Sequence, residues 1–265
     1  MAVHTARRRV RKADMSRGWW WLFPWDFSPT VLVTAMLAGV WYWHRGADLS
    51  RWRRVSFWFG WAAMYAALQS GLDYYAQHAF FVHRIQHLLL HHAAPFLIAL
   101  GLPVPSCQNR HTASPWPRQF AHPWITAALF NGLVLFWLLP AVHFPAMLDW
   151  RYYRLMNWGV AINGLMFWIL VLRGVAPGWA RVGDGQRIAM MLAVVPVQIA
   201  IGALIFSATN DLYPNYALCG RAFGMTALED QQLGGLILWI PGAMMSVIGV
   251  LLISYPRFLE SRARA

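Results

Sequence analysis

Residues 78–102 read HAFFVHRIQHLLLHHAAPFLIALGL, an apolar segment that holds five of the ten histidines of this 265-residue chain. The part from Phe80 to Leu102 is long enough to cross the roughly 30 Å of bilayer hydrocarbon, because a helix rises about 1.5 Å per residue. The segment therefore predicts a transmembrane helix. Ionisable side chains are costly in lipid, so its histidines are expected to face a bundle interior or a polar cavity.

Six further apolar windows accompany this one, and no strand-like alternation competes with them. The seven windows are residues 29–43, 55–72, 80–102, 123–142, 155–172, 188–206 and 233–254. A composition of 58% hydrophobic and 12% charged residues agrees with a bilayer as solvent. We predict an all-α, polytopic membrane protein with a seven-helix bundle over 28–255. A basic, Trp-rich segment (1–27) precedes it and a short basic tail (256–265) follows.

The net charge of +12 predicts orientation rather than nucleic-acid binding, because the basic residues lie at the ends of apolar runs. The first, third and fifth loops and the C-terminal tail hold twelve arginines, whereas the opposite side holds Arg151, Arg154 and Arg221. This bias predicts a cytoplasmic C-terminus and an outer N-terminus in a bacterial inner (plasma) membrane, in contact with anionic lipid. The basic N-terminal tail favours the reverse, and the loops are given more weight.

His83, His87 and His91 are spaced i, i+4, i+8 and form a stripe on one helix face, while His92 is expected to point elsewhere. Neighbours on the stripe are close enough to share a metal ion, but His83 and His91 are about 12 Å apart along the axis. One site would need ligands from other helices, or two sites lie in series. The alternative is that the histidines are neutral, bond backbone or Gln86, and only pack.

Under the preferred orientation, three loops bring further donors to the outer end of this helix. These donors are Asp73, His78, His143, Asp149, Cys219, Met225, Glu229 and Asp230. Imidazole with thioether or thiolate donors suits copper, and Cu(I) favours the softer sulfur ligands. The acids near the seventh window also suit simple capping of its helix. No nucleotide loop, HExxH, serine elbow or catalytic carboxylate pair is visible, so the chain is not expected to be an enzyme.

Three blocks resemble the CtaG family of cytochrome c oxidase assembly factors, seven-helix proteins first associated with caa-type oxidases. They are VHRIQHLLLHHAAPFLIALGLP (82–103), LPAVHFPA (139–146), and DLYPNYA (211–217) with LEDQQLGGLILWIPG (228–242). The matching positions are His83, Gln86, His87, Pro95, Gly101, Pro103, His143, Pro145, Tyr213, Pro214, Tyr216, Asp230, Gln231, Gly234, Gly235, Trp239 and Pro241. The resemblance covers roughly 25–242.

The resemblance implies a role in biogenesis of a haem-copper oxidase, with copper delivered to an oxidase subunit or a periplasmic copper chaperone. It makes His83, His87 and His143 the family-matched ligands. Where members often have another histidine, this chain has Asn157, whereas His91 and His92 are additions. Supporting roles are expected for Asp73, Gln86, Asp149, Tyr213, Tyr216, Asp230 and Gln231.

Three other functions fit parts of the pattern. The first is a membrane electron carrier in which His87 and His143 ligate a b-type haem from opposite sides. The second is a copper permease, which needs ligands through the full depth of the membrane, although the candidates thin out beyond His92. The third is an assembly scaffold without metal.

Overall fold

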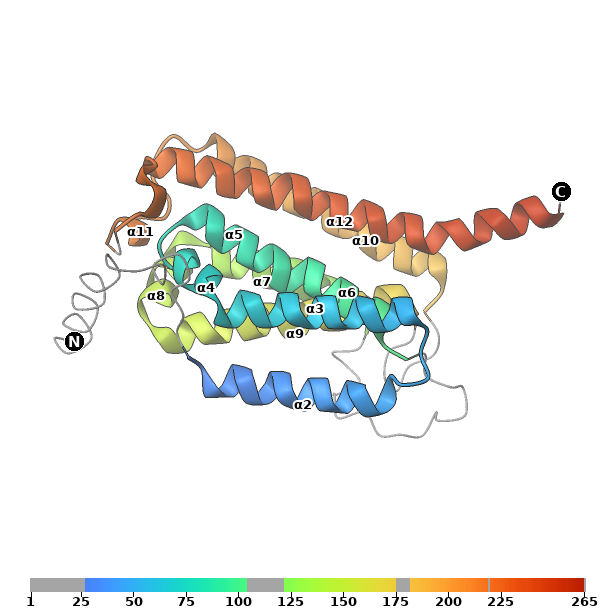
Figure 1. The fold of residues 1–265 in the computed structure, drawn as a ribbon. Coiled ribbons are helices and arrows are strands. Elements are labelled where there is room, and N and C mark those ends of the chain that lie inside the picture. Colours follow the sequence, from blue (N-terminus) through green and yellow to red (C-terminus); the bar gives the residue numbers. More distant parts are fainter. Residues whose placement is uncertain (1–26, 104–121, 175–181, 219, 265) are drawn as a thin grey trace.

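The computed structural model describes residues 27–103, 122–174, 182–218 and 220–264, and every regular element within them is a helix (Figure 1). In chain order the elements are α2 (Pro29–Arg45), α3 (Arg51–Gln69), α4 (Gly71–Ala76), α5 (Phe80–Leu88), the π-helical turn η3 (Leu89–Ala93), α6 (Ala94–Gly101), α7 (Pro123–Leu138), α8 (Pro140–Leu148), α9 (Trp150–Arg173), α10 (Asp184–Ser207), α11 (Asn215–Leu218), the short 3₁₀ helix η5 (Ala222–Gly224) and α12 (Ala227–Arg264). The predicted all-α fold is confirmed.

Each of the seven apolar windows coincides with helix, but several boundaries differ. The second window crosses the break between α3 and α4, the fourth crosses the break between α7 and α8, and α9 begins before its window. The third window is divided into α5, η3 and α6, because five residues in its middle adopt the π conformation. The last helix, α12, continues to Arg264 and so includes residues that were expected to form a separate tail. Prolines are the first residues of α2, α7 and α8. The N–H that proline lacks would have no partner within the helix at this position, so its loss costs no helical hydrogen bond.

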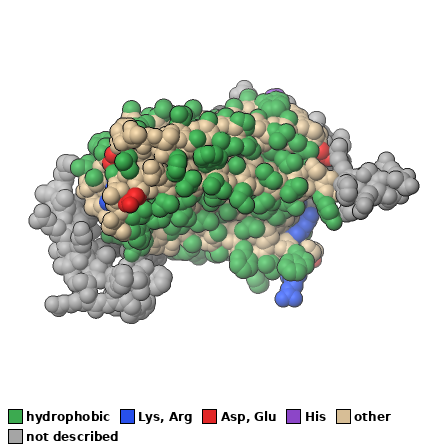
Figure 2. All heavy atoms as spheres, turned by 90° about the horizontal axis from the view of Figure 1, so that it is seen from above, with side chains coloured by type: hydrophobic (Ala, Val, Ile, Leu, Met, Phe, Trp, Pro, Cys, Tyr) green, Lys and Arg blue, Asp and Glu red, His purple; other side chains and the backbone are tan. Residues whose placement is uncertain are grey.

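Three of the described helices are long and apolar enough to cross a membrane: α9, α10 and residues 227–255 of α12. A fourth crossing results if α7 and α8, which meet at 74°, form one broken span. Figure 2 shows hydrophobic side chains over the middle of one face of the molecule and charged ones toward its ends. Large apolar side chains such as Leu204 and Leu251 are more than half exposed, as expected of a surface that faces lipid.

The helices α10 and α12 lie side by side along their length (Figure 1). They approach closely at Gly202 and Gly235, where a Cβ added to either residue would be 2.8 Å from the carbonyl oxygen of the other. Glycine at these two positions therefore allows the helices to pack closely. α12 also packs against α5, since Gly234 lies directly against the ring of Phe80.

One end of the bundle gathers the short elements α4, α8 and α11 with the beginnings of α5 and α12 (left in Figure 1). At the opposite end, Arg173 donates to backbone carbonyls at the end of α6, and Arg187 donates to carbonyls at the end of α9. Cations at helix C-termini satisfy carbonyls that have no partner within their own helix. The first end holds the histidine cluster.

Candidate metal centre

Two of the predicted ligands face each other on α5. His83 and His87 are one turn apart, and their Nε2 atoms are separated by 2.9 Å. Both side chains are buried, with 4.5 Å between ring centroids. Residues four apart on a helix are neighbours on its surface. The predicted adjacency of this pair is therefore confirmed.

The hydroxyl of Tyr216 connects the pair to a third histidine. It lies 2.7 Å from Nδ1 of His83 and 3.1 Å from Nε2 of His143. Tyr216 belongs to α11 and His143 to α8, so three elements meet at this hydroxyl. Burial raises the pKa of Tyr216 well above its ordinary value, and the phenol keeps its proton.

A backbone carbonyl determines where the protons of this network lie. The oxygen of Trp137 is 2.9 Å from Nδ1 of His143 and can only accept, so a neutral His143 donates from Nδ1 and accepts at Nε2. Tyr216 then donates to His143 and accepts from Nδ1–H of His83. The hydrogen-bond network therefore assigns a lone pair to Nε2 of His83 and the shared proton to Nε2 of His87.

This geometry fits an ion with two ligands. Two imidazole nitrogens that bind one ion from opposite sides at about 2 Å each lie about 4 Å apart, so the two rings, now 2.9 Å apart at Nε2, would have to separate by about 1 Å. Among the described residues, no group of three or more His, Cys, Asp or Glu side chains converges on a metal position. Cu(I) accepts two nearly collinear ligands, whereas structural Zn²⁺ is almost always four-coordinate.

A polar network from α4, α5 and α9 borders the pair. Oδ1 of Asp73 accepts from Nε2 of Gln86 at 2.7 Å and from the hydroxyl of Tyr153 at 2.8 Å. Gln86 also donates to the carbonyl of Ala67. The alternative in which Gln86 bonds the histidines is therefore not what the structure shows. Its role is to hold α5 against its neighbours, close to His83, whose ring is 5.9 Å from that of Tyr153.

Asn157 lies beside His87, at the position where the family resemblance expects a histidine. It is buried on α9, one turn after Tyr153, and its side chain interacts with both His87 and Tyr153. Within the described part of the chain, its Oδ1 satisfies no hydrogen-bond geometry. A histidine at position 157 would therefore lie next to the pair of His83 and His87, whereas this chain has an amide there.

Asp230 stabilises the start of α5 rather than the start of its own helix. Its buried carboxylate accepts from the backbone N–H groups of Phe80 at 3.0 Å and Phe81 at 2.9 Å, and from Nη1 of Arg221 at 2.6 Å. The first N–H groups of a helix have no partner within it, so Asp230 caps the helix that carries the histidines. Gln231 bonds backbone groups at the end of α10 and in the loop that follows.

Tyr213 is a second buried phenol next to the centre. Its hydroxyl donates to the carbonyl of Leu138 at 3.0 Å, and its ring stacks on Phe80 with 4.1 Å between centroids. Burial raises the pKa of Tyr213 to about 12. Unlike Tyr216, this hydroxyl bonds the backbone at the end of α7 and not an imidazole.

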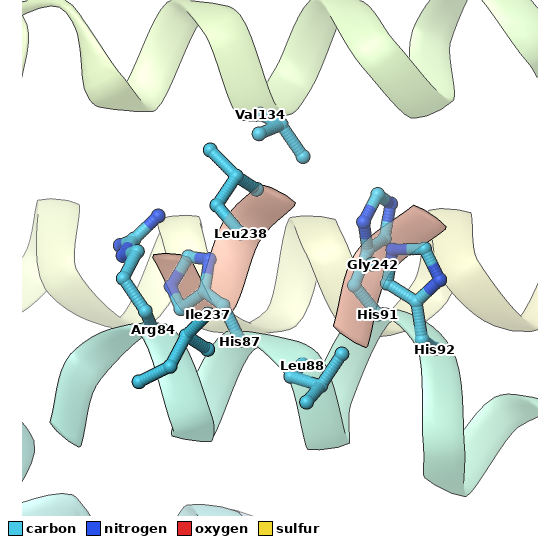
Figure 3. A pocket seen from close by; sticks show the side chains of 9 residues that line it. All are labelled: Arg84, His87, Leu88, His91, His92, Val134, Ile237, Leu238 and Gly242. Atoms are coloured by element: carbon cyan, nitrogen blue, oxygen red, sulfur yellow. The ribbon is translucent and has the colours of Figure 1, made fainter. Parts of the chain in front are cut away.

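His91 and His92 line a narrow cavity that includes His87 and continues along the same helix (Figure 3). His91 donates from Nε2 to Oδ1 of Asn163 at 3.2 Å, and Nε2 of Gln198 donates to Nε2 of His92 at 3.1 Å. The expectation that His92 points away from its neighbours is wrong. That expectation assumed an α-helical rotation of 100° per residue, whereas the wider π-helical turn η3 rotates less per residue. The side chains of His91 and His92 are both buried, with 5.3 Å between their ring centroids.

The structure gives other surroundings to the remaining predicted ligands. His78 donates from Nδ1 to the carbonyl of Tyr74 at 2.7 Å and stacks on the ring of the same residue. Asp149 caps α9 by accepting from a backbone N–H at 2.8 Å. Met225 follows η5 and is half-buried. Cys219 lies outside the described residues.

Sequence reasoning missed two groups of the site, the side chain of Tyr153 and the carbonyl of Trp137. The predicted fifth window begins at residue 155 and so excludes Tyr153, although α9 begins at Trp150. The available signal was the i, i+4 spacing of Tyr153 and Asn157, two polar side chains on one face of an apolar helix. A backbone acceptor gives no sequence signal.

Comparisons with known proteins agree with this architecture. Residues 34–256 match the family model described as cytochrome c oxidase caa3 assembly factor (Caa3_CtaG). An uncharacterised protein of Mycobacterium leprae is 26% identical over 246 aligned residues, and uncharacterised proteins of Mycobacterium bovis and Mycobacterium tuberculosis are each 25% identical over the same length. Each alignment covers 81% of this chain but only 36% of the relative, so the chain spans about a third of their length. No solved structure matches.

Because the family model covers most of the chain, this protein belongs to the Caa3_CtaG family of cytochrome c oxidase caa3 assembly factors.

Proposed function

We propose that this chain binds Cu(I) between Nε2 of His83 and Nε2 of His87 and delivers it to a subunit of a haem-copper oxidase, directly or through a periplasmic copper chaperone. The observation that carries the proposal is the 2.9 Å separation of these two buried nitrogens. Family membership supports the part of the proposal that concerns oxidase assembly.

Cu(I) would replace the single proton that the two Nε2 atoms share. A neutral His87 that binds through Nε2 carries its proton on Nδ1, so the proton moves within the ring and both ligands stay neutral. His83 needs no change, because its network already places a lone pair on Nε2. Two neutral ligands leave room for a third donor from the recipient, which suits a protein that must release its cargo.

The proposed arrangement in the membrane has seven crossings, with the C-terminus cytoplasmic and the N-terminus outside, in a bacterial inner membrane. The arginine distribution supports this orientation. It places α4, α8 and α11, and with them His83 and His87, at the outer side. A periplasmic donor or recipient would approach from that side.

The proposal is tested by loading detergent-purified protein with copper under reducing conditions. Elemental analysis and an optical spectrum would compare the wild type with His83→Ala/His87→Ala. The control is His44→Ala, which removes an exposed histidine on α2. We expect about one copper per chain in the wild type and control, and none in the double variant with its helicity retained.

Two other outcomes would overturn the proposal. A Soret band after haem supplementation would favour the b-type haem carrier. Wild-type protein that stays metal-free after loading would favour a scaffold that acts without metal.

A further inference from the structure

Arg84 is a buried cation next to the histidine pair. Its exposed fraction is 3%, so its side chain does not extend to the surface as long basic side chains in membrane proteins usually do. The guanidinium carbon lies 5.1 Å from the centroid of the Phe80 ring. Within the described part of the chain, Nε and Nη2 have no hydrogen-bond partner. A guanidinium stays protonated in proteins, so this side chain keeps its charge.

The nearby carboxylates are engaged by other groups. Asp230 accepts from Arg221 and from two backbone N–H groups, and Asp73 accepts from Gln86 and Tyr153. The ion pairs found among the described residues are made by Arg187 and Arg221, and none includes Arg84. An unpaired buried charge costs several kcal/mol, so a counter-charge from outside the chain would stabilise this region.

The Arg84 side chain lies on the wall of a narrow cavity (Figure 3). Figure 3 shows it on the same wall as three imidazoles, while apolar residues of α7 and α12 close the other side. The lining residues are Arg84, His87, Leu88, His91, His92, Val134, Ile237, Leu238 and Gly242. The cavity measures about 20 Å³, which is enough for one water-sized occupant.

A second unpartnered donor lines the same cavity. Because Gln198 donates to Nε2 of His92, a neutral His92 carries its proton on Nδ1. That Nδ1 is buried and has no partner in the described structure. The described cavity wall thus has a charged donor at Arg84, a neutral donor eight residues further along the helix, about 12 Å along its axis, and no carboxylate.

We propose that this cavity binds a small monovalent anion of the size of chloride, held chiefly by Nε and Nη2 of Arg84. A water molecule would satisfy one N–H but would leave the charge uncompensated. The proposed ligand is the guanidinium of Arg84 and not the Nε2 atoms of His83 and His87, although His87 also lines the cavity.

The test uses metal-free, full-length protein in detergent, with potassium gluconate replaced stepwise by potassium chloride at constant ionic strength. Thermal unfolding followed by intrinsic tryptophan fluorescence gives Tm at each chloride concentration. The variant Arg84→Gln removes the proposed ligand. The matched control Arg154→Gln removes the same charge from an exposed position on α9.

We expect the wild type and Arg154→Gln to gain roughly 5 °C in Tm along a saturating curve, because a ligand that binds only the folded state stabilises it. The Tm of Arg84→Gln should not respond. A flat wild-type curve, or an equal response in Arg84→Gln, would overturn the proposal.

If Arg84→Gln does not fold, equilibrium dialysis of the wild type against radioactive chloride decides: about one bound chloride per chain supports the site and none overturns it. Neither readout involves copper, so failure here and failure of copper binding are distinguishable.

Discussion

The hydroxyl oxygen of Tyr216 lies 2.7 Å from Nδ1 of His83. This contact joins the segment between α10 and α12 to the histidine pair on α5. Tyr216 gives its single proton to His143, so toward His83 it can only accept. His83 is thereby held in the tautomer whose Nε2 lone pair faces His87. Tyr216 is not itself a proposed ligand, but it orients His83, which is.

Replacing Tyr216 with Phe should weaken copper binding without removing a ligand. His83 then loses the acceptor for its Nδ1–H, and the ring can change tautomer and turn. Partners that orient metal-binding histidines typically affect affinity by about 10–100-fold, and we expect a loss of Cu(I) affinity in that range. Competition with a chromophoric Cu(I) chelator measures the Kd.

The matched control for this prediction is Tyr213→Phe. It also removes a buried hydroxyl, but one that donates to the carbonyl of Leu138. Both variants should lose about 1–3 kcal/mol of stability, because each leaves buried polar groups without a partner. Only Tyr216→Phe should change the Kd. Equal changes of Kd in both variants would mean that Tyr216 acts through stability alone.

Replacing Asn157 with His should strengthen copper binding. The Asn157 side chain already interacts with His87, and its Oδ1 has no hydrogen bond to lose. A third imidazole beside the pair would convert two-coordinate binding into three-coordinate binding, with an expected gain of tenfold or more in Cu(I) affinity. Each tenfold corresponds to about 1.4 kcal/mol. Asn157→Leu provides the control, since it changes the packing without adding a ligand, and an equal gain there would refute the role of the imidazole.

The helical architecture was accessible from the sequence because it follows from local pattern. Apolar windows of roughly membrane length located the helical regions, although the break between α7 and α8 falls inside the fourth window and was not predicted. The pairing of His83 with His87 followed from the i, i+4 rule, which needs no tertiary information.

The remaining features of the site depend on tertiary structure or on departures from ideal helices. The π-helical turn η3 was not predicted from the sequence, although Pro95 follows it at the start of α6, and the turn places His92 at the cavity. The bridge through Tyr216 requires α11 to lie against α8, a contact between residues more than 70 apart. The burial of Arg84 contradicts its usual preference for interfaces and depends on how α12 packs over α5.

Replacing Asp230 with Asn should destabilise the whole histidine region. The amide keeps the shape of the carboxylate but removes the charge that faces Arg221, and it offers one oxygen where two N–H groups of α5 are now satisfied. Removing one partner of a buried ion pair costs about 3–5 kcal/mol, and the remaining contact of Arg221 with Asp211 should reduce this loss. Thermal unfolding should show a fall in Tm of several degrees.

Glu229→Gln is the neighbouring control for Asp230→Asn. Glu229 forms a capping box with Thr226 at the exposed start of α12, with hydrogen bonds of 2.8 and 3.3 Å between side chains and backbone. Glutamine can make the same bonds, so we expect a much smaller change in Tm. A larger loss from Glu229→Gln than from Asp230→Asn would contradict the assignment of Asp230 as the cap of α5.

Replacing Gly202 with Ala should separate α10 from α12. The new Cβ would lie 2.8 Å from the carbonyl oxygen of Gly235 and 2.9 Å from the backbone nitrogen of Trp239, and backbone atoms cannot rotate away as a flexible side chain can. Overpacking of this kind typically costs about 1–3 kcal/mol. We expect a fall in Tm of several degrees in detergent.

Gly159→Ala gives the opposite expectation on α9 and makes the test of Gly202 specific. A Cβ at Gly159 meets no atom within 4 Å, so the substitution only removes the conformational freedom of glycine from a helix interior. Stability should rise by about 0.5–1 kcal/mol. If Gly202→Ala raised Tm as Gly159→Ala is expected to do, the contact between α10 and α12 would have to be looser than 2.8 Å implies. The packing of α12 over Arg84 and the histidines would then be looser as well.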